Sequence, residues 1–173
     1  MFLLCTLPLF VFLAVFIKLD SKGPVFYRQV RIGRGGKPFM VYKFRTMVTG
    51  AEKIGPLITE RNDRRTTKAG RFLRAFSLDE VPQFINVFLG DMSVVGPRPE
   101  VRPYVKKYSS WQRKVLAVKP GITGLSQVNG RADLSIPTKL RYDIYYIKHM
   151  SLWMDIKIIL KTVIVVFRRE GAY

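Results

Sequence analysis

The amino-terminal run MFLLCTLPLFVFLAVFI most constrains the fold, because it carries no charge before Lys18 and so apolar a stretch must leave water. As a straight helix it would reach only about 25 Å, which is shorter than a hydrocarbon core of roughly 30 Å. Pro8 also removes a backbone N–H near its middle. We therefore predict a membrane-inserted helix over residues 1–19 that breaks at Pro8 and re-enters, followed by one domain over residues 20–173.

Three other structures are compatible with this run. A tilted helix would span the membrane, and a helix of this length would also suit a protein core. A cleaved signal peptide is the third, but no positive residue precedes the run, and the stretch from Lys18 to Lys22 is a poor small-residue cleavage site. The re-entrant hairpin is preferred.

Composition narrows the chemistry. A chain of 173 residues that is 48% hydrophobic has enough material for one domain with a core. Its formal net charge of +18 indicates an anionic partner, which is nucleic acid, an acidic membrane surface or a phosphorylated substrate. Cys5 and His149 are the only residues of their types, so an internal disulfide and a Cys/His zinc site are excluded. Carboxylates, lysines and arginines remain for the chemistry.

The middle of the chain predicts a helix-rich α/β domain with a small sheet. Alternating bulky and polar residues in PVFYRQVRIGRGGKPFMVYKFRTM predict a β-hairpin that turns at residues 33–36. The polar segment 48–68 predicts a loop, either a plain connection or a lid. Helical spacing over 71–76 and 81–88 predicts two helices that meet near Ser77.

The second half of the chain is also mostly helical by its pattern. The two prolines of GPRPE predict an extended path that holds Arg98 rigidly. A helical stretch over 104–118 leads into the glycine-rich loop KPGITGLSQVNGR, and two amphipathic helices follow, around Tyr142 and over 151–169. The last of these mixes aliphatic side chains with lysines and arginines, so we predict an interfacial helix on an anionic leaflet; a core helix with snorkelling lysines is the alternative.

The segment SLDEVPQ contains two adjacent acids, although acids are scarce in this chain. The pair either begins a helix or takes part in chemistry. Asp79 and Glu80 match a helix start, with either Ser77 or Asp79 as the N-cap. Pro82 favours Asp79, since the proline then falls in the first turn, where no ladder bond is lost. At that position the helix dipole would lower the pKa of Asp79 and keep it ionised.

An ionised aspartate that faces phosphoryl groups is a recognised nucleophile for covalent phosphoryl transfer. Mg²⁺ held by Glu80 and Asp79 would neutralise the phosphate oxygens, with help from Arg98 and Lys43. From spacing alone, a helix cap remains an equally valid interpretation of the pair.

The segments KGPVFYRQ, YKFRTM, SLDEVPQFINVFLGDMSVVGPRPE, KPGITGLSQVNGR and YDIYYI together resemble, in order and spacing, the bacterial sugar transferase family of monotopic polyprenyl-phosphate sugar-1-phosphate transferases. The resemblance covers essentially the whole chain. It implies an enzyme on the cytoplasmic face of the bacterial inner membrane that moves a sugar 1-phosphate from a UDP-sugar to undecaprenyl phosphate and releases UMP. Downstream glycosyltransferases and anionic lipid are the further partners that we expect.

The resemblance also implies roles for particular residues. Asp79 matches the nucleophile that carries the phosphosugar, and Glu80 matches the second acid, assigned to Mg²⁺ and positioning. The residues expected to bind substrate are Lys43, Arg45, Arg98, Lys119, Arg131 and Asp143. Purely structural roles remain possible for these residues: on the solvated face of a strand, as a helix cap or as a brace within a loop.

Two departures from the family pattern concern the apolar run. Leu7 precedes Pro8 where the family usually has serine, and the helix of the family begins farther upstream. The first limb of the re-entrant helix is therefore short, which would suit a truncated chain or a piece of a longer relative. Ser126 stands where members often carry an aromatic residue.

Two alternatives belong to other classes. A basic nucleic-acid-binding module would account for the charge, but it leaves the apolar run unexplained and would place two acids against a phosphate backbone. We therefore expect no nucleic-acid partner. A membrane scaffold with an inactive site is the other alternative.

Overall fold

The computed structural model describes residues 2–56, 63–130 and 133–169, with side chains from Pro8 onward. The helices are α1 (Phe2–Asp20), α2 (Lys68–Ala75), α3 (Gln83–Phe88), α4 (Arg102–Lys106), α5 (Leu125–Val128), α6 (Ile136–Lys148) and α7 (Leu152–Phe167). The strands are β1 (Phe26–Ile32), β2 (Pro38–Phe44), β3 (Ser93–Val95) and β4 (Gly121–Thr123). The expected helix-rich α/β class is thus confirmed for the described residues.

The predicted β-hairpin forms as expected. Strands β1 and β2 pair antiparallel, with Phe26 opposite Phe44 and Ile32 opposite Pro38, and a short turn at Arg34–Gly36 joins them. The positive φ angles of Gly35 and Gly36 (66° and 76°) are the reason why glycine suits this turn. A second, parallel pair, β3 and β4, holds the GPRP loop beside the glycine-rich loop.

Helix α3 docks on the hairpin through one buried side chain. Asn86 accepts a hydrogen bond from the Tyr42 N–H (3.1 Å) and donates one to the Met40 carbonyl (2.7 Å). Its amide therefore satisfies backbone groups on the free edge of β2, as a neighbouring strand would. This contact fixes α3, and the turn that precedes it, over the hairpin.

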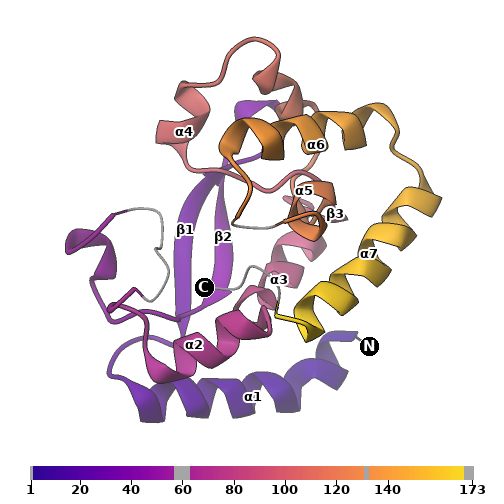
Figure 1. Cartoon of the computed structure of the whole chain (residues 1–173). Coiled ribbons are helices and arrows are strands. Elements are labelled where there is room, and N and C mark those ends of the chain that lie inside the picture. Colours follow the sequence, from indigo (N-terminus) through magenta and orange to yellow (C-terminus); the bar gives the residue numbers. More distant parts are fainter. Residues whose placement is uncertain (1, 57–62, 131–132, 170–173) are drawn as a thin grey trace.

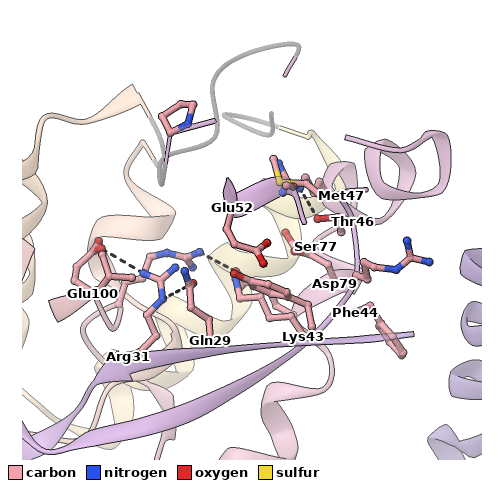
Figure 2. Close-up of a pocket in the computed structure, with 18 of the residues that line it drawn as sticks. Gln29, Arg31, Lys43, Phe44, Thr46, Met47, Glu52, Ser77, Asp79 and Glu100 are labelled. Atoms are coloured by element: carbon pink, nitrogen blue, oxygen red, sulfur yellow. Dashed lines mark hydrogen bonds and ion pairs between the residues drawn. The ribbon is translucent and has the colours of Figure 1, made fainter. Parts of the chain in front are cut away.

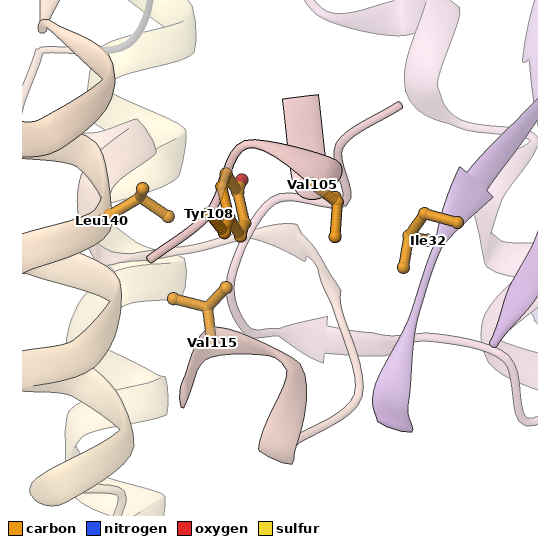
Figure 3. Close-up of a cluster of buried hydrophobic side chains, with 5 residues drawn as sticks. All are labelled: Ile32, Val105, Tyr108, Val115 and Leu140. Atoms are coloured by element: carbon orange, nitrogen blue, oxygen red, sulfur yellow. The ribbon is translucent and has the colours of Figure 1, made fainter. Parts of the chain in front are cut away.

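Among the described residues, the core consists of three hydrophobic clusters. One joins β1 to α6 and the segment between them, through Ile32, Val105, Tyr108, Val115 and Leu140 (Figure 3). A second lies under α7 and contains Val95, Val128, Tyr146 and Ile158. The third joins α1 to the hairpin and α2, through Leu13, Ile17, Phe44 and Leu73. Figure 1 shows α1 lying along the base of the molecule next to α2.

The predicted break at Pro8 is not present in the structure. Helix α1 is continuous and contains Pro8, so this proline costs one ladder hydrogen bond without ending the helix. None of the described helices combines the length and apolar character that crossing a membrane requires. The re-entrant path and the boundary between residues 19 and 20 stay predictions, while Leu13 and Ile17 pack against the rest of the protein, as the core-helix alternative required.

Candidate active site

A cavity of about 550 Å³ opens over the face of the hairpin that carries Tyr27, Gln29, Arg31 and Lys43. Its walls come from β1 and β2, the loop after β2, the turn between α2 and α3, the GPRP loop, α5 and α6. Figure 2 shows Lys43 on the side of Asp79 and Ser77, while Arg31 lies on the other side, next to Gln29 and Glu100. Asp79 and Glu80 both line this cavity.

The acids sit on a turn of their own, not at the start of α3. Ser77 has a left-handed backbone (φ 53°) and precedes a single 3₁₀ turn over Leu78–Glu80. The N-cap of α3 is Pro82, so the expected capping by Asp79 is wrong. The reason is backbone pairing: hydrogen bonds from the Glu80 N–H to Ser77 and from the Val81 N–H to Leu78 close a separate turn before the proline.

Glu80 is held by two cations. Lys43 Nζ and an Arg98 guanidinium nitrogen each donate to Glu80 Oε1 at 2.9 Å. Burial opposes ionisation of Glu80, but the charges and hydrogen bonds of Arg98 and Lys43 prevail and hold its pKa well below the usual range. Glu80 is therefore ionised, and its charge in turn raises the pKa of Arg98. These are three of the residues that the sequence pointed to, brought together at one oxygen.

Asp79 has the opposite tendency. Burial raises the pKa of Asp79, and the charge of Glu80 adds to this, while Lys43, Arg74 and Arg98 oppose it. The expected lowering of the pKa of Asp79 is wrong, because burial outweighs the attraction of the neighbouring cations. Its neighbouring cations thus decide how readily it ionises.

The roles of Arg45 and Arg74 in the structure differ from what the sequence suggested. Arg45 lines the cavity, yet its guanidinium donates to the carbonyls of Ser21, Lys22 and Pro24 at 2.6–3.1 Å. It joins the end of α1 to the hairpin, so its substrate contact stays a prediction. Arg74, which the sequence reasoning missed, donates through Nε to Thr46 (2.9 Å) and also lines the cavity near Asp79. The sequence signal that could have identified Arg74 is its position about one helical turn before SLDE.

Asp143 lies in the wall formed by α6 and is only 4% exposed. Burial raises its pKa to about 7, the charge of Glu100 adds to the rise, and Ser126 and Lys139 oppose it. Its Oδ1 atom has no hydrogen-bond partner within the described part of the chain. The structure thus places Asp143 in the same cavity as the acidic pair.

Of the remaining predicted binding residues, only Lys119 lies within the described part of the chain. Lys119 is exposed and approaches Gly90, and it is absent from the cavity lining. Arg131 lies outside the described residues. Arg31, by contrast, was not predicted and lies in the floor, where it contacts Glu100 (3.4 Å) and the Pro99 carbonyl (3.2 Å). Strand alternation with Tyr27 and Gln29 was the signal that would have found it.

No group of three or more His, Cys, Asp or Glu side chains with metal-binding geometry occurs among the residues that the structure describes. Two adjacent carboxylates are nevertheless a fitting donor set for Mg²⁺, which commonly binds one or two carboxylates and takes its other ligands from water and substrate phosphate. Asp79 and Glu80 provide that set beside three cations.

Comparison with known proteins identifies the family to which this arrangement belongs. The family model described as "Bacterial sugar transferase" matches residues 1–169. The chain belongs to this family. The resemblance inferred from the sequence is thereby confirmed.

Proteins from several bacteria are similar in sequence to this chain. A UDP-glucose:undecaprenyl-phosphate glucose-1-phosphate transferase of Klebsiella pneumoniae is 44% identical over 96% of this chain and 37% of its own length. An undecaprenyl-phosphate galactose phosphotransferase of Salmonella typhimurium is 42% identical over 100% of this chain and 39% of its own. The uncharacterized sugar transferase EpsL of Bacillus subtilis is 43% identical over 98% of this chain and 83% of its own. The chain thus spans about two fifths of the length of the first two relatives and most of EpsL.

Proposed function

We propose that this chain transfers a sugar 1-phosphate from a UDP-sugar to undecaprenyl phosphate and releases UMP. The observation that carries the proposal is the turn that presents Asp79 and Glu80 to a basic cavity, with Lys43 and Arg98 on one carboxylate oxygen. The substrate class is suggested by the Klebsiella and Salmonella relatives, which are named as undecaprenyl-phosphate sugar phosphotransferases.

The chemistry follows from the two different acids. Asp79 attacks the phosphorus that bears the sugar; an aspartyl–phosphosugar bond forms, the bond to UMP breaks, and UMP leaves with the electron pair. An oxygen of the polyprenyl phosphate then attacks the same phosphorus, and the carboxylate of Asp79 is released. Glu80 stays ionised and anchors Lys43 and Arg98, which offset the negative charge of the phosphates. Mg²⁺ bound by Asp79 and Glu80 would supply further charge neutralisation there.

The setting of the reaction is part of the proposal. An isoprenoid acceptor places the enzyme at a membrane, and we assign it to the cytoplasmic face of the bacterial inner membrane, on anionic lipid. The reaction would be the first membrane step of an exopolysaccharide, capsule, O-antigen or glycoprotein glycan, so that downstream glycosyltransferases would take its product. The apolar α1 and the exposed apolar residues of α7 support this placement.

The test is intact-protein mass spectrometry on lipid-solubilised protein with Mg²⁺ and a panel of UDP-sugars, without polyprenyl phosphate. We expect a sugar-phosphate mass increment together with UMP release, both absent in Asp79→Asn. Adding undecaprenyl phosphate should then remove the increment. Turnover of all donors without any adduct would contradict the covalent route, and absence of both adduct and UMP across the panel would contradict the proposed activity.

A further inference from the structure

Two buried oxygen atoms on one wall of the cavity lack hydrogen-bond partners. They are Oε1 of Gln127 on α5 and Oδ1 of Asp143 on α6, both without a partner among the described residues. Helices α5 and α6 pack on each other, and both residues line the cavity that holds Asp79. A buried acceptor without a partner is destabilising, so two of them on one cavity wall point to a ligand that supplies their hydrogen bonds.

The orientation of the Gln127 amide is fixed by a second contact. Its Nε2 donates to the Ile122 carbonyl at 2.8 Å, so Nε2 is the donor end and Oε1 is left to accept. Asp143 also offers an oxygen, next to Ser126, the residue before Gln127. When Asp143 is ionised, the wall therefore presents only acceptors, and its ligand must present donors.

The parts of a UDP-sugar differ in what they would bring to this wall. Phosphates carry mainly acceptors at neutral pH. Their suitable partners are the cations near Asp79, which are Lys43, Arg74 and Arg98. A uracil ring has a single N–H between two carbonyl oxygens, and those oxygens would face the wall unfavourably. A vicinal diol, on the hexose or on the ribose, offers two adjacent O–H donors. It is the group that would supply a donor to each of two acceptors on packed helices.

We propose that Gln127 and Asp143 form a hydroxyl-accepting wall that binds a vicinal diol of the donor substrate. This inference rests on the proposed function and extends it, because it names the part of the substrate that the α5–α6 end of the cavity recognises. Asp143 and Gln127 act here as binding residues and take no part in bond breaking.

The experiment measures binding, so that it does not depend on turnover. Isothermal titration in the Asp79→Asn background compares an intact UDP-sugar with two kinds of analogue: the same donor built on 2′-deoxyuridine, and UDP-hexoses that lack one ring hydroxyl. Each titration is repeated with Asp143→Leu and with Gln127→Met, which remove one acceptor at little change in volume. Gln112→Met is the matched control, because Gln112 accepts from the Ser109 N–H away from the cavity. Circular dichroism confirms that each variant is folded.

We expect loss of one hydroxyl to weaken binding about tenfold when Asp143 and Gln127 are both present. In Asp143→Leu or Gln127→Met the same loss should cost less than about threefold, since the partner of the hydroxyl is already gone. We call this reduced effect of hydroxyl loss in a variant coupling. Coupling with the 2′-deoxy donor would show that the wall binds the ribose, and coupling with a deoxyhexose would show that it binds the sugar.

The proposal is overturned if no analogue shows coupling to either folded variant, or if Gln112→Met couples as strongly. Failure of the proposed function has a different signature: UDP-sugars bind but yield neither adduct nor UMP in the unsubstituted protein. The coupling then still decides whether the wall recognises hydroxyls. If no UDP-sugar binds at all, both proposals fall.

Discussion

Ser77 sets the direction of the acidic pair through its backbone. Its φ of 53° lies in the left-handed region, which costs a non-glycine residue roughly 1–2 kcal/mol. The kink ends α2 and starts the short turn that carries Asp79 into the cavity. Strain of this kind persists only where the surrounding structure enforces it, and it is common at functional sites.

The left-handed backbone gives a prediction for Ser77. Ser77→Val should lower the free energy of unfolding by about 1–2 kcal/mol relative to Ser77→Gly, because a β-branched side chain tolerates positive φ poorly. Thermal unfolding in detergent measures this difference. UMP release should fall in the valine variant and persist in the glycine variant. Equal stability of the two variants would mean that the turn relaxes, and Ser77→Ala separates any contribution of the hydroxyl.

Asp143 links stability to pH. Its pKa is raised from 3.8 to about 7, mainly by burial, so the folded protein binds the Asp143 proton more tightly than the unfolded chain does. The contribution to stability is full below pH 4 and is lost as pH rises to about 7, on the order of 4 kcal/mol in all. Two charged groups act on the Asp143 carboxyl: Glu100 raises its pKa, and Lys139 opposes the rise.

We therefore expect Asp143→Asn to become progressively more stable, relative to the unsubstituted protein, as pH rises from about 4 to 7. Above pH 7 the difference should be constant. Denaturant unfolding of ligand-free protein at several pH values checks this, with Asp91→Asn as the comparison outside the cavity lining. A stability difference that does not change with pH would show that folding does not raise the pKa of Asp143.

At this scale the sequence predicted which charged side chains would lie together better than it predicted their surroundings. Lys43 and Arg98 meet at Glu80 and Asp79 lines the same cavity, because the acids, the YKFR strand and the GPRP loop are marked by local motifs. The pKa of Asp79 could not be predicted, since it depends on burial and on Arg74, which only the tertiary fold brings near. Gln127 was missed for the same reason: an unpaired oxygen is a property of packing.

Helix α1 connects the apolar run to the reactive turn. Its Leu13 and Ile17 are buried in a cluster that also contacts Leu78 and Val81, the residues that flank Asp79 and Glu80. The helix thus forms the support beneath the turn in addition to any role in a membrane. The hairpin and the helices on either side of Ser77 were predictable from periodicity, whereas continuity of α1 through Pro8 was not, because packing can offset one lost hydrogen bond.

This packing predicts that α1 supports catalysis. Leu13→Ala should destabilise the protein by about 2–5 kcal/mol, the usual cost of a buried Leu→Ala change, and should lower UMP release even where the fold survives. Phe12→Ala is the matched control, since Phe12 is adjacent and 65% exposed. Thermal unfolding and UMP release are measured on both variants in the same detergent. Equal effects of the two substitutions would contradict a specific support of the turn by Leu13.

At the scale of the whole molecule, exposed apolar residues and excess positive charge occur together. Leu152, Trp153, Leu160 and Phe167 on α7 are between 61% and 78% exposed, while Ile158 and Val165 of the same helix are buried. One face of α7 therefore packs on the domain and another remains open. With a net charge of +18, such a surface suits an anionic lipid leaflet, where apolar contact and electrostatic attraction add.

Vesicle flotation tests this surface of α7. We expect the protein to bind vesicles that contain phosphatidylserine more tightly than neutral vesicles, and added salt to weaken the difference through screening. Combining Trp153→Ala with Leu160→Ala should reduce partitioning by roughly 2–4 kcal/mol, because both side chains lose apolar burial. Trp111→Ala is the control: Trp111 is 41% exposed but precedes the turn Gln112–Ala117, remote in sequence from α7. If the control weakens binding as much as the pair does, α7 is not the lipid-binding face, and α1 would have to account for membrane binding by itself.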